Sequence, residues 1–183
     1  MRIIRGELAG KLLIMPKSGL TRPTSDKVRQ AVFNILDHHS EMPSLKEAWV
    51  LDAFAGTGAL GFEALSRGAG KVTFVDIQRE MILNLYNLIN NWNLKGRTHV
   101  LAQDILTLPE AEKAVDYIFC DPPYGKNLIN LSIEHLYEQG WIHSDTVIIA
   151  EMHKKDVIDL KFSIEILQEK KYGDTKIIFF KLG

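Results

Sequence analysis

An α/β fold with a mostly parallel sheet is predicted for this chain by three observations. From Trp49 onward, short apolar runs alternate with segments of helical spacing, which is typical of βα units. A glycine-rich turn over residues 56–61 follows the first apolar run. Near the end, two strand-like runs flank Gly173-Asp174 at the spacing of a hairpin, which adds one antiparallel strand. We therefore expect a seven-stranded sheet with helices on both faces.

The first 40 residues are expected to form a small extension of a single domain, with the core spanning residues 41–183. Two apolar segments flank Gly6 and Gly10, which predicts a hairpin. After a loop, Thr24-Ser25-Asp26 offers caps for a helix. The apolar residues of this helix share one face; they are Val28, Ala31, Val32, Ile35 and Leu36.

The core then follows as alternating strands and helices. Strands are predicted over residues 48–51, 71–75, 98–101, 115–120 and 146–150. Helices are predicted over residues 60–65, 79–91 and 129–137, the first ending near a glycine stop at Arg67-Gly68. Two strands, residues 162–169 and 176–182, form the closing hairpin.

Length and composition limit the class of protein. The chain has 183 residues, enough for one domain with a core, and 46% of them are hydrophobic and 25% charged, as in ordinary globular proteins. No apolar run approaches a membrane span, and the start lacks a signal peptide's hydrophobic region. The single cysteine, Cys120, excludes an intramolecular disulfide and a zinc site built on a cysteine pair. We expect a cytoplasmic protein without a membrane partner.

Charge is distributed unevenly along the chain. Residues 1–30 hold seven basic and two acidic side chains, a net +5, whereas the whole chain carries −1, so the remainder carries −6. A basic end on an acidic body suggests a polyanionic partner such as nucleic acid. Charge alone leaves an ordinary solvated surface equally open.

The turn after the first predicted strand matches the dinucleotide fingerprint G-x-G-x-x-G with Gly56, Gly58 and Gly61. Asp76 ends the next strand about 20 residues later, where an acid can bind both ribose hydroxyls. Two cofactor classes fit this pattern, NAD(P) and another adenosine cofactor. Asp52 and Ala55 lie in the same loop and are further candidates for cofactor contact.

Asp104 follows the third predicted strand and is placed to accept a hydrogen bond from an adenine amino group. Ile77 and Ile105 would hold the ring from its two sides. A role for Asp104 as a helix cap is compatible with this one.

Asp121-Pro122-Pro123-Tyr124 ends the fourth predicted strand. Two prolines cannot extend a sheet, so a carboxylate, rigid carbonyls and an aromatic ring remain at the carboxyl edge, where ligands bind in such folds. Asp121 and the carbonyl of Pro122 can accept both hydrogens of an exocyclic amine and aim its lone pair at an electrophile. Tyr124 can stack on the base. A reaction at such an amine requires correct orientation of the amine and acceptors for its hydrogens more than it requires a strong general base.

These residues resemble those of the class I S-adenosylmethionine-dependent methyltransferases that methylate amines. The cofactor loop would be residues 52–58, Asp76 the ribose acid, and residues 121–124 the [D/N/S]-P-P-[Y/F/W] motif. This resemblance implies a Rossmann-like class I methyltransferase fold with S-adenosylmethionine as cofactor. The NAD(P) interpretation assigns no function to Asp121 to Tyr124.

A closer resemblance is to the RsmD family, bacterial 16S rRNA (guanine-N2)-methyltransferases, and it runs nearly end to end. It rests on residues 1–6, 10–11, 21–29, 33–36, 61–69 and 172–175. It implies methylation of one guanine, at position 966 in the usual numbering, within an assembling small subunit. One departure is visible, because the family has glutamate where this chain has Asp76.

With this resemblance, the basic extension is expected to bind phosphates of 16S rRNA in a partly assembled 30S subunit. The candidates are Arg2, Arg5, Arg22, Lys27 and Arg29. Arg22 has the strongest case, because Pro23 keeps it extended and outside the helix. No histidine pair has helical ligand spacing beside an acid, so no metal is expected. Nothing in the sequence demands a dimer.

Three rival functions remain at this point. A DNA adenine-N6 or other nucleic-acid amino-methyltransferase shares the logic of residues 121–124, although 183 residues leave little room for a target-recognition segment. An NAD-dependent oxidoreductase fits the glycine turn alone. A non-catalytic RNA-binding or assembly module fits the basic extension alone.

Overall fold

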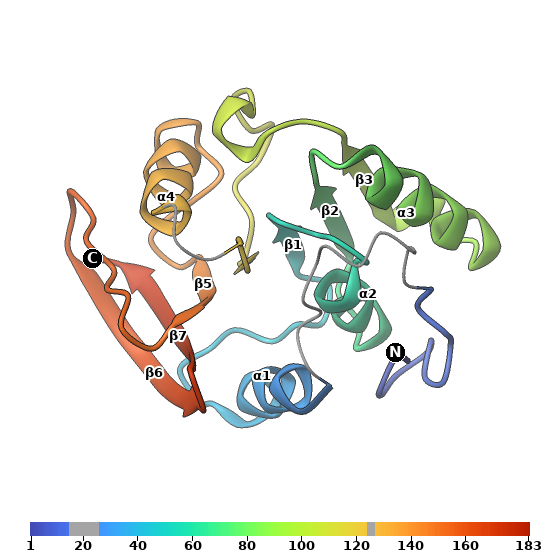
Figure 1. Ribbon diagram of the computed structural model, residues 1–183, viewed down its shortest axis with the longest axis horizontal. Coiled ribbons are helices and arrows are strands. Elements are labelled where there is room, and N and C mark those ends of the chain that lie inside the picture. The colour runs from blue at the N-terminus through green and yellow to red at the C-terminus, as the bar shows by residue number, and fades with distance from the viewer. Residues whose placement is uncertain (15–25, 124–126) are drawn as a thin grey trace.

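The computed structural model describes residues 1–14, 26–123 and 127–183, and a seven-stranded sheet is its centre. The strands are β1 (Trp49–Asp52), β2 (Lys71–Val75), β3 (Thr98–Leu101), β4 (Tyr117–Cys120), β5 (Val147–His153), β6 (Ile164–Tyr172) and β7 (Thr175–Leu182). The helices are α1 (Asp26–His38), α2 (Ala59–Ser66), α3 (Arg79–Asn91) and α4 (Leu128–Glu138), with short 3-10 turns η1 (Lys95–Arg97) and η2 (Ile105–Thr107) (Figure 1).

The strand order, β3-β2-β1-β4-β5-β7-β6, confirms the predicted class. Strands β1 to β5 pair in parallel, and β7 lies antiparallel between β5 and β6. The chain moves outward from β1 to β3 and then returns to place β4 on the other side of β1. Ligands bind at the carboxyl ends of the strands at such a reversal, so the topology locates a site between β1 and β4.

Alternate residues of the central strands build two separate apolar clusters, one on each face of the sheet. The first joins residues such as Val50, Phe74 and Phe119 to α1, α2 and α3. The second joins Leu51, Val75, Ile118 and their neighbours to α4 and η2. Successive side chains of a strand point to opposite faces of the sheet, and helices bury both faces. Nearly every residue of a central strand is therefore apolar, which explains the continuous apolar runs in the sequence.

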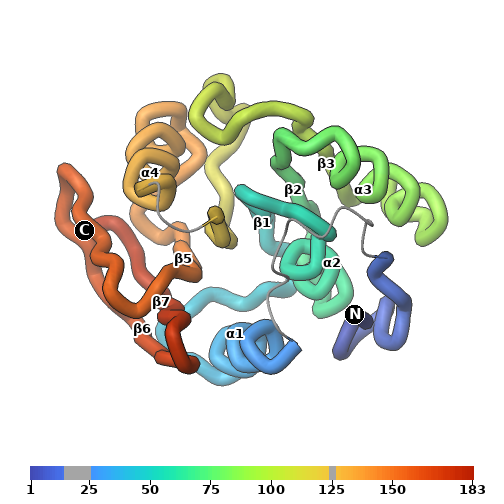
Figure 2. Tube along the Cα trace, viewed as in Figure 1, coloured from blue at the N-terminus to red at the C-terminus, as the bar shows by residue number. Residues whose placement is uncertain are grey.

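The amino-terminal residues 1–14 form a looser structure than the predicted hairpin. One antiparallel bridge joins Arg2 to Leu12, and the backbone between them is a series of turns. Ile3, Leu8 and Leu13 are buried in the first apolar cluster. Figure 2 shows this segment beside α2, which anchors it through hydrogen bonds described below.

Most predicted elements match within a few residues, and α3 matches at both ends. The closing hairpin is longer than predicted, because β6 continues to Tyr172 and β7 begins at Thr175, with only two residues in the turn. The cap residues Thr24 and Ser25 lie outside the described residues. Among the described residues, no helix has both the length and the apolar character needed to cross a membrane.

Candidate cofactor and substrate site

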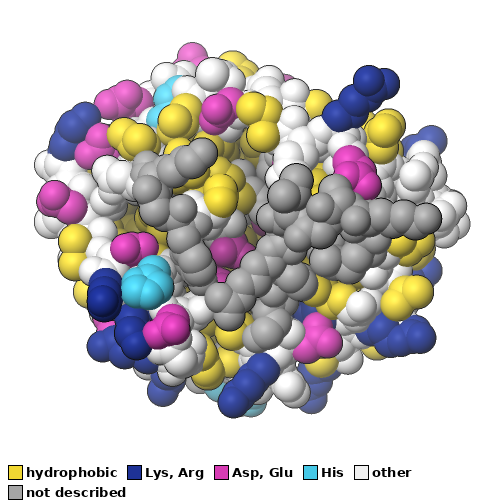
Figure 3. All heavy atoms as spheres, in the orientation of Figure 1, with side chains coloured by type: hydrophobic (Ala, Val, Ile, Leu, Met, Phe, Trp, Pro, Cys, Tyr) yellow, Lys and Arg dark blue, Asp and Glu magenta, His cyan; other side chains and the backbone are white. Residues whose placement is uncertain are grey.

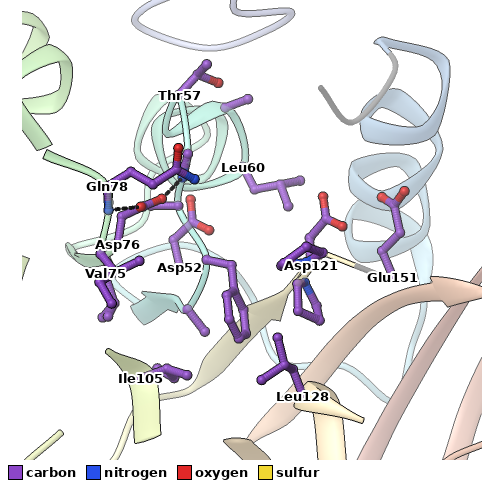
Figure 4. A pocket seen from close by; sticks show the side chains of 18 of the residues that line it. Asp52, Thr57, Leu60, Val75, Asp76, Gln78, Ile105, Asp121, Leu128 and Glu151 are labelled. Carbon is purple, nitrogen blue, oxygen red and sulfur yellow. Dashed lines mark hydrogen bonds between the residues drawn. The ribbon is translucent and has the colours of Figure 1, made fainter. Parts of the chain in front are cut away.

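A cavity of about 830 Å³ opens at the carboxyl ends of the central strands. It gathers many of the predicted site residues: Lys27, Asp52, Ala55, Gly56, Asp76, Ile77, Asp104, Ile105, Asp121 and Pro122. Figure 4 shows the side chains of Asp52, Asp76 and Asp121 turned toward this space from the carboxyl ends of three neighbouring strands, β1, β2 and β4. Tyr124 and Arg22 lie outside the described residues. Gly58 lies in the same turn but does not line the cavity.

The glycine turn leaves one side of its backbone open. Gly56 has a φ of +52°, which L side chains rarely adopt, and among the described residues, its own chain neighbours apart, no atom lies within 4 Å of the position a Cβ would take. Gly61 has the opposite surroundings, since a Cβ there would lie 2.3 Å from the Phe74 ring. Gly56 therefore leaves room for a ligand, and Gly61 lets α2 pack closely on β2, as the sequence predicts.

Asp76 joins the loop after β2 to the glycine turn. Its Oδ2 accepts a hydrogen bond from the backbone N–H of Gly56 at 2.8 Å, and its Oδ1 accepts from the N–H of Gln78 at 2.7 Å. The side chain is 9% exposed and lines the cavity (Figure 4). Asp76 thus fixes two loops at the place predicted for a ribose.

Asp52 is a buried carboxylate at the end of β1. Its Oδ2 accepts from the backbone N–H of Gly61 at 2.9 Å, across the first turn of α2. Burial raises the pKa of Asp52 to about 7, and the charges of Asp121 and Asp76 add to the increase, while the Gly61 hydrogen bond opposes it. An apolar-walled cavity with several carboxylates is suited to a cationic ligand, which would relieve their mutual repulsion.

The three residues predicted to hold adenine line the same cavity. Asp104 caps η2, because its Oδ1 accepts from the N–H of Leu106 at 2.9 Å, and it lines the cavity as well. Ile105 is buried, whereas Ile77 is 69% exposed. An exposed apolar side chain beside a buried one provides the two surfaces expected for holding a flat ring.

The opposite end of the cavity contains residues that sequence reasoning did not assign to the site. Glu151 comes from β5, Tyr172 from the end of β6, and Thr175 from the start of β7. The register of the sheet brings Glu151 beside Asp121, and the hairpin between β6 and β7 pairs Tyr172 with Thr175 at the cavity wall. The sequence shows only that Glu151 follows the predicted strand over residues 146–150; its position beside Asp121 depends on the pairing of β4 with β5.

The basic candidates are not gathered in one place. Lys27 is exposed and lines the cavity. Arg2 donates to the carbonyl of Gly10, and Arg5 lies 3.7 Å from the Asp37 carboxylate with most of its side chain exposed. Figure 3 shows Lys and Arg side chains at several separate points around the margin of this face.

Arg29 requires a correction. Its side chain is 0% exposed, and its guanidinium donates to the carbonyl of Arg2 and to the Asp26 carboxylate. A group buried in this way cannot reach a phosphate, so the prediction of an RNA contact is wrong for Arg29. The residue attaches the amino-terminal segment to α1 instead.

Glu63 holds the same segment from α2. This fully buried carboxylate accepts hydrogen bonds from the backbone N–H groups of Ile4 (2.8 Å) and Arg5 (3.1 Å) and from the Nε of Arg67 (2.9 Å). Gly6 lies so close to α2 that a Cβ would overlap the carbonyl of Ser66. The amino-terminal segment is therefore built onto the helix that follows the glycine turn.

No group of three or more His, Cys, Asp or Glu side chains suited to a metal ion occurs within residues 1–14, 26–123 and 127–183. Cys120 is buried, and burial raises the pKa of its thiol above its ordinary value. A thiol held protonated is a poor nucleophile.

The family model described as conserved hypothetical protein 95 matches residues 1–181. Ribosomal RNA small subunit methyltransferase D of Haemophilus influenzae is 34% identical, covering 94% of this chain and 89% of the relative. The protein of the same name from Escherichia coli strain K12 is 35% identical over 82% of this chain and 74% of its own length. A solved structure described as a putative methyltransferase, yhhF, from Escherichia coli has a TM-score of 0.86 at 28% identity, covering 100% of this chain and 97% of that one.

Proposed function

This chain belongs to the RsmD family, whose model is described as conserved hypothetical protein 95, and from that premise we propose that it is an rRNA methyltransferase. The methyl donor would be S-adenosylmethionine, and the acceptor the N2 amine of a guanine in 16S rRNA. The observation that carries this proposal is a single cavity that joins the glycine turn and Asp76 to Asp121 and Pro122.

The donor end of the cavity fits S-adenosylmethionine. Asp76 would bind the ribose hydroxyls, Asp104 and the two isoleucines would hold adenine, and the open backbone at Gly56 would let the ligand approach closely; the common lining of the cavity supports this assignment. The carboxylates of Asp52 and Asp76 would favour the positive charge of the donor. A volume of about 830 Å³ is within the range of ligand pockets and leaves room for a base.

S-adenosylmethionine supplies an electrophilic methyl group and leaves as a neutral thioether. Asp121 and the carbonyl of Pro122 would accept the two N2 hydrogens and turn the amine lone pair toward that group. As the nitrogen–carbon bond forms, N2 becomes acidic, and one of its protons passes to the Asp121 carboxylate or to water. Correct placement supplies most of the acceleration, and no covalent enzyme intermediate is needed.

The RNA would reach the site with its target base out of the stack, as enzymes that modify bases require. Lys27 at the cavity wall is placed to meet a phosphate of the extruded nucleotide. Arg5, and Arg22 from the sequence, would extend this contact along the backbone. We propose a partly assembled 30S subunit as the substrate, a monomer as the working form and the cytoplasm as the location.

Two measurements test the proposal. Calorimetry with S-adenosylmethionine and with NADH should show binding of the first alone; tight NADH binding without binding of the methyl donor would refute it. With S-adenosylmethionine labelled in its methyl group, the label should appear in 16S rRNA as N2-methylguanine. N6-methyladenine in DNA together with unmodified rRNA would favour the adenine-N6 alternative. Asp121→Ala should lose methylation and keep both fold and cofactor binding.

A further inference from the structure

Glu151 lies beside Asp121 at the carboxyl edge of the sheet. Cys120 of β4 pairs in parallel register with Ala150 of β5, so the two carboxylates follow at matching positions one residue later. Neighbouring strands are about 4.8 Å apart, and matching positions direct their side chains to the same side. Figure 4 shows the carboxylates of Asp121 and Glu151 next to each other and pointing the same way.

Glu151 also lies where two cavities meet. It lines the large cavity and a second one of about 440 Å³ between α4 and the segment after β5. Pro122, Pro123 and Leu128 are the other residues common to both. Glu151 is therefore near enough to contact a base held at Asp121.

The bases that carry an exocyclic amine differ in the ring nitrogen next to that amine, and this determines whether a neighbouring carboxylate can accept a hydrogen bond from the base. In guanine, the N2 amine is flanked on one side by the N1–H donor. In adenine and cytosine, the Watson–Crick ring nitrogen beside the amine is an acceptor with a lone pair. When Asp121 holds the amine, an ionised carboxylate beside it gains a charge-assisted hydrogen bond from guanine and is repelled by the other two bases.

We propose that Glu151 is a specificity-determining residue that accepts the N1–H of the target guanine while Asp121 holds its N2 amine. This inference rests on the proposed function and adds the reason that the site takes guanine in preference to adenine or cytosine. It also fixes the orientation of the base, because the N3 side of guanine presents a lone pair and would be turned away from Glu151.

The test compares two bases at the methylated position of 16S rRNA in reconstituted 30S subunits. One is guanine, and the other is 2-aminopurine, which keeps the C2 amine but has an acceptor at N1. The wild type should prefer guanine. In Glu151→Gln, whose amide can donate to an acceptor, the ratio of kcat/KM for guanine to that for 2-aminopurine should fall by about tenfold to a hundredfold.

The matched control is Glu165→Gln, an exposed acid on β6 outside both cavities, which should leave the ratio unchanged.

An unchanged ratio in Glu151→Gln with an active wild type would overturn this inference and leave the proposed function standing. Loss of cofactor affinity in Glu151→Gln would overturn it too, since Glu151 would then act on the donor site. If Glu151→Gln does not fold, Glu151→Asp replaces it, and its shortened carboxylate should also lower the ratio. A wild type that methylates no rRNA would overturn both proposals.

Discussion

The backbone N–H of Gly56 donates to the carboxylate of Asp76 at 2.8 Å, so the residue proposed to bind the ribose also holds the glycine turn. The second oxygen of Asp76 accepts from Gln78. The turn therefore has its shape before any ligand binds, and a ligand pays less in conformational entropy for binding to it.

Asp76→Ala should weaken S-adenosylmethionine binding by about tenfold to a hundredfold, because it removes a charged acceptor and two loop hydrogen bonds. Asp76→Glu, which keeps a carboxylate at this position, should bind within about tenfold of the wild type. Calorimetry measures both, with Asp145→Asn, at an exposed turn, as the control. Equal affinity in Asp76→Ala and the wild type would exclude a ribose contact.

Asp52 should make the free protein less stable as the pH rises. Its pKa is raised from 3.8 to about 7 by burial, so between these values the folded state binds more protons than the unfolded state. The free energy of unfolding then falls as the pH increases through about 7. Asp52→Asn removes this titration and should be more stable than the wild type at pH 8 by roughly 1 kcal/mol or more.

Denaturant titrations at pH 5 and pH 8 check this prediction, since the variant and the wild type should differ less at the lower pH, where the carboxyl is mostly protonated. The same variant should bind S-adenosylmethionine more weakly at pH 8, because the neutral amide does not attract a cation. A stability difference independent of pH would show that Asp52 does not titrate in this range.

Glu63→Ala should detach the amino-terminal segment from α2. The change leaves two backbone N–H groups without their buried acceptor, while the Arg67 guanidinium keeps its pair with Asp37; each lost acceptor costs about 1–3 kcal/mol. Hydrogen exchange should show faster exchange at Ile4 and Arg5, and the melting temperature should fall. Unchanged protection at these amides would mean that apolar packing alone holds the segment.

Substitutions of the basic residues should fall into two groups, those that lower RNA affinity and those that lower the stability of the protein. Arg22→Ala and Arg5→Ala should weaken RNA engagement more than cofactor binding and reduce the salt dependence of RNA affinity, with a slope change of about one per lost phosphate contact. Arg29→Ala should instead lower stability, because its side chain is buried and holds Arg2 and Asp26. The opposite pattern, with stability lost in Arg5→Ala and RNA affinity lost in Arg29→Ala, would contradict this division.

Local patterns in the sequence were sufficient to predict the sheet and the position of three acidic residues at its carboxyl edge. Periodicity located the strands, and each of Asp52, Asp76 and Asp104 follows a strand that could be recognised on its own. Because parallel strands end at one edge, these residues had to meet. The turn at Gly173 was also sufficient to predict the closing hairpin, but it did not predict how long the two strands are.

The parts that escaped prediction depend on contacts between distant segments. Glu151 meets Asp121 only through the pairing of β4 with β5, and the burial of Arg29 depends on the path of residues 1–14 over α2. A basic residue on a helix looks the same in the sequence whether it faces solvent or a neighbouring carbonyl. Charge counting therefore could not separate Arg29 from Lys27.

The central claim is most directly tested by incubating the protein and S-adenosylmethionine with 30S subunits from a strain that lacks the activity, and then mapping the modified base by mass spectrometry of 16S rRNA fragments. N2-methylguanine should appear at a single position and be absent with Asp121→Ala. Modification of a different base or atom, or equal modification by Asp121→Ala, would contradict it.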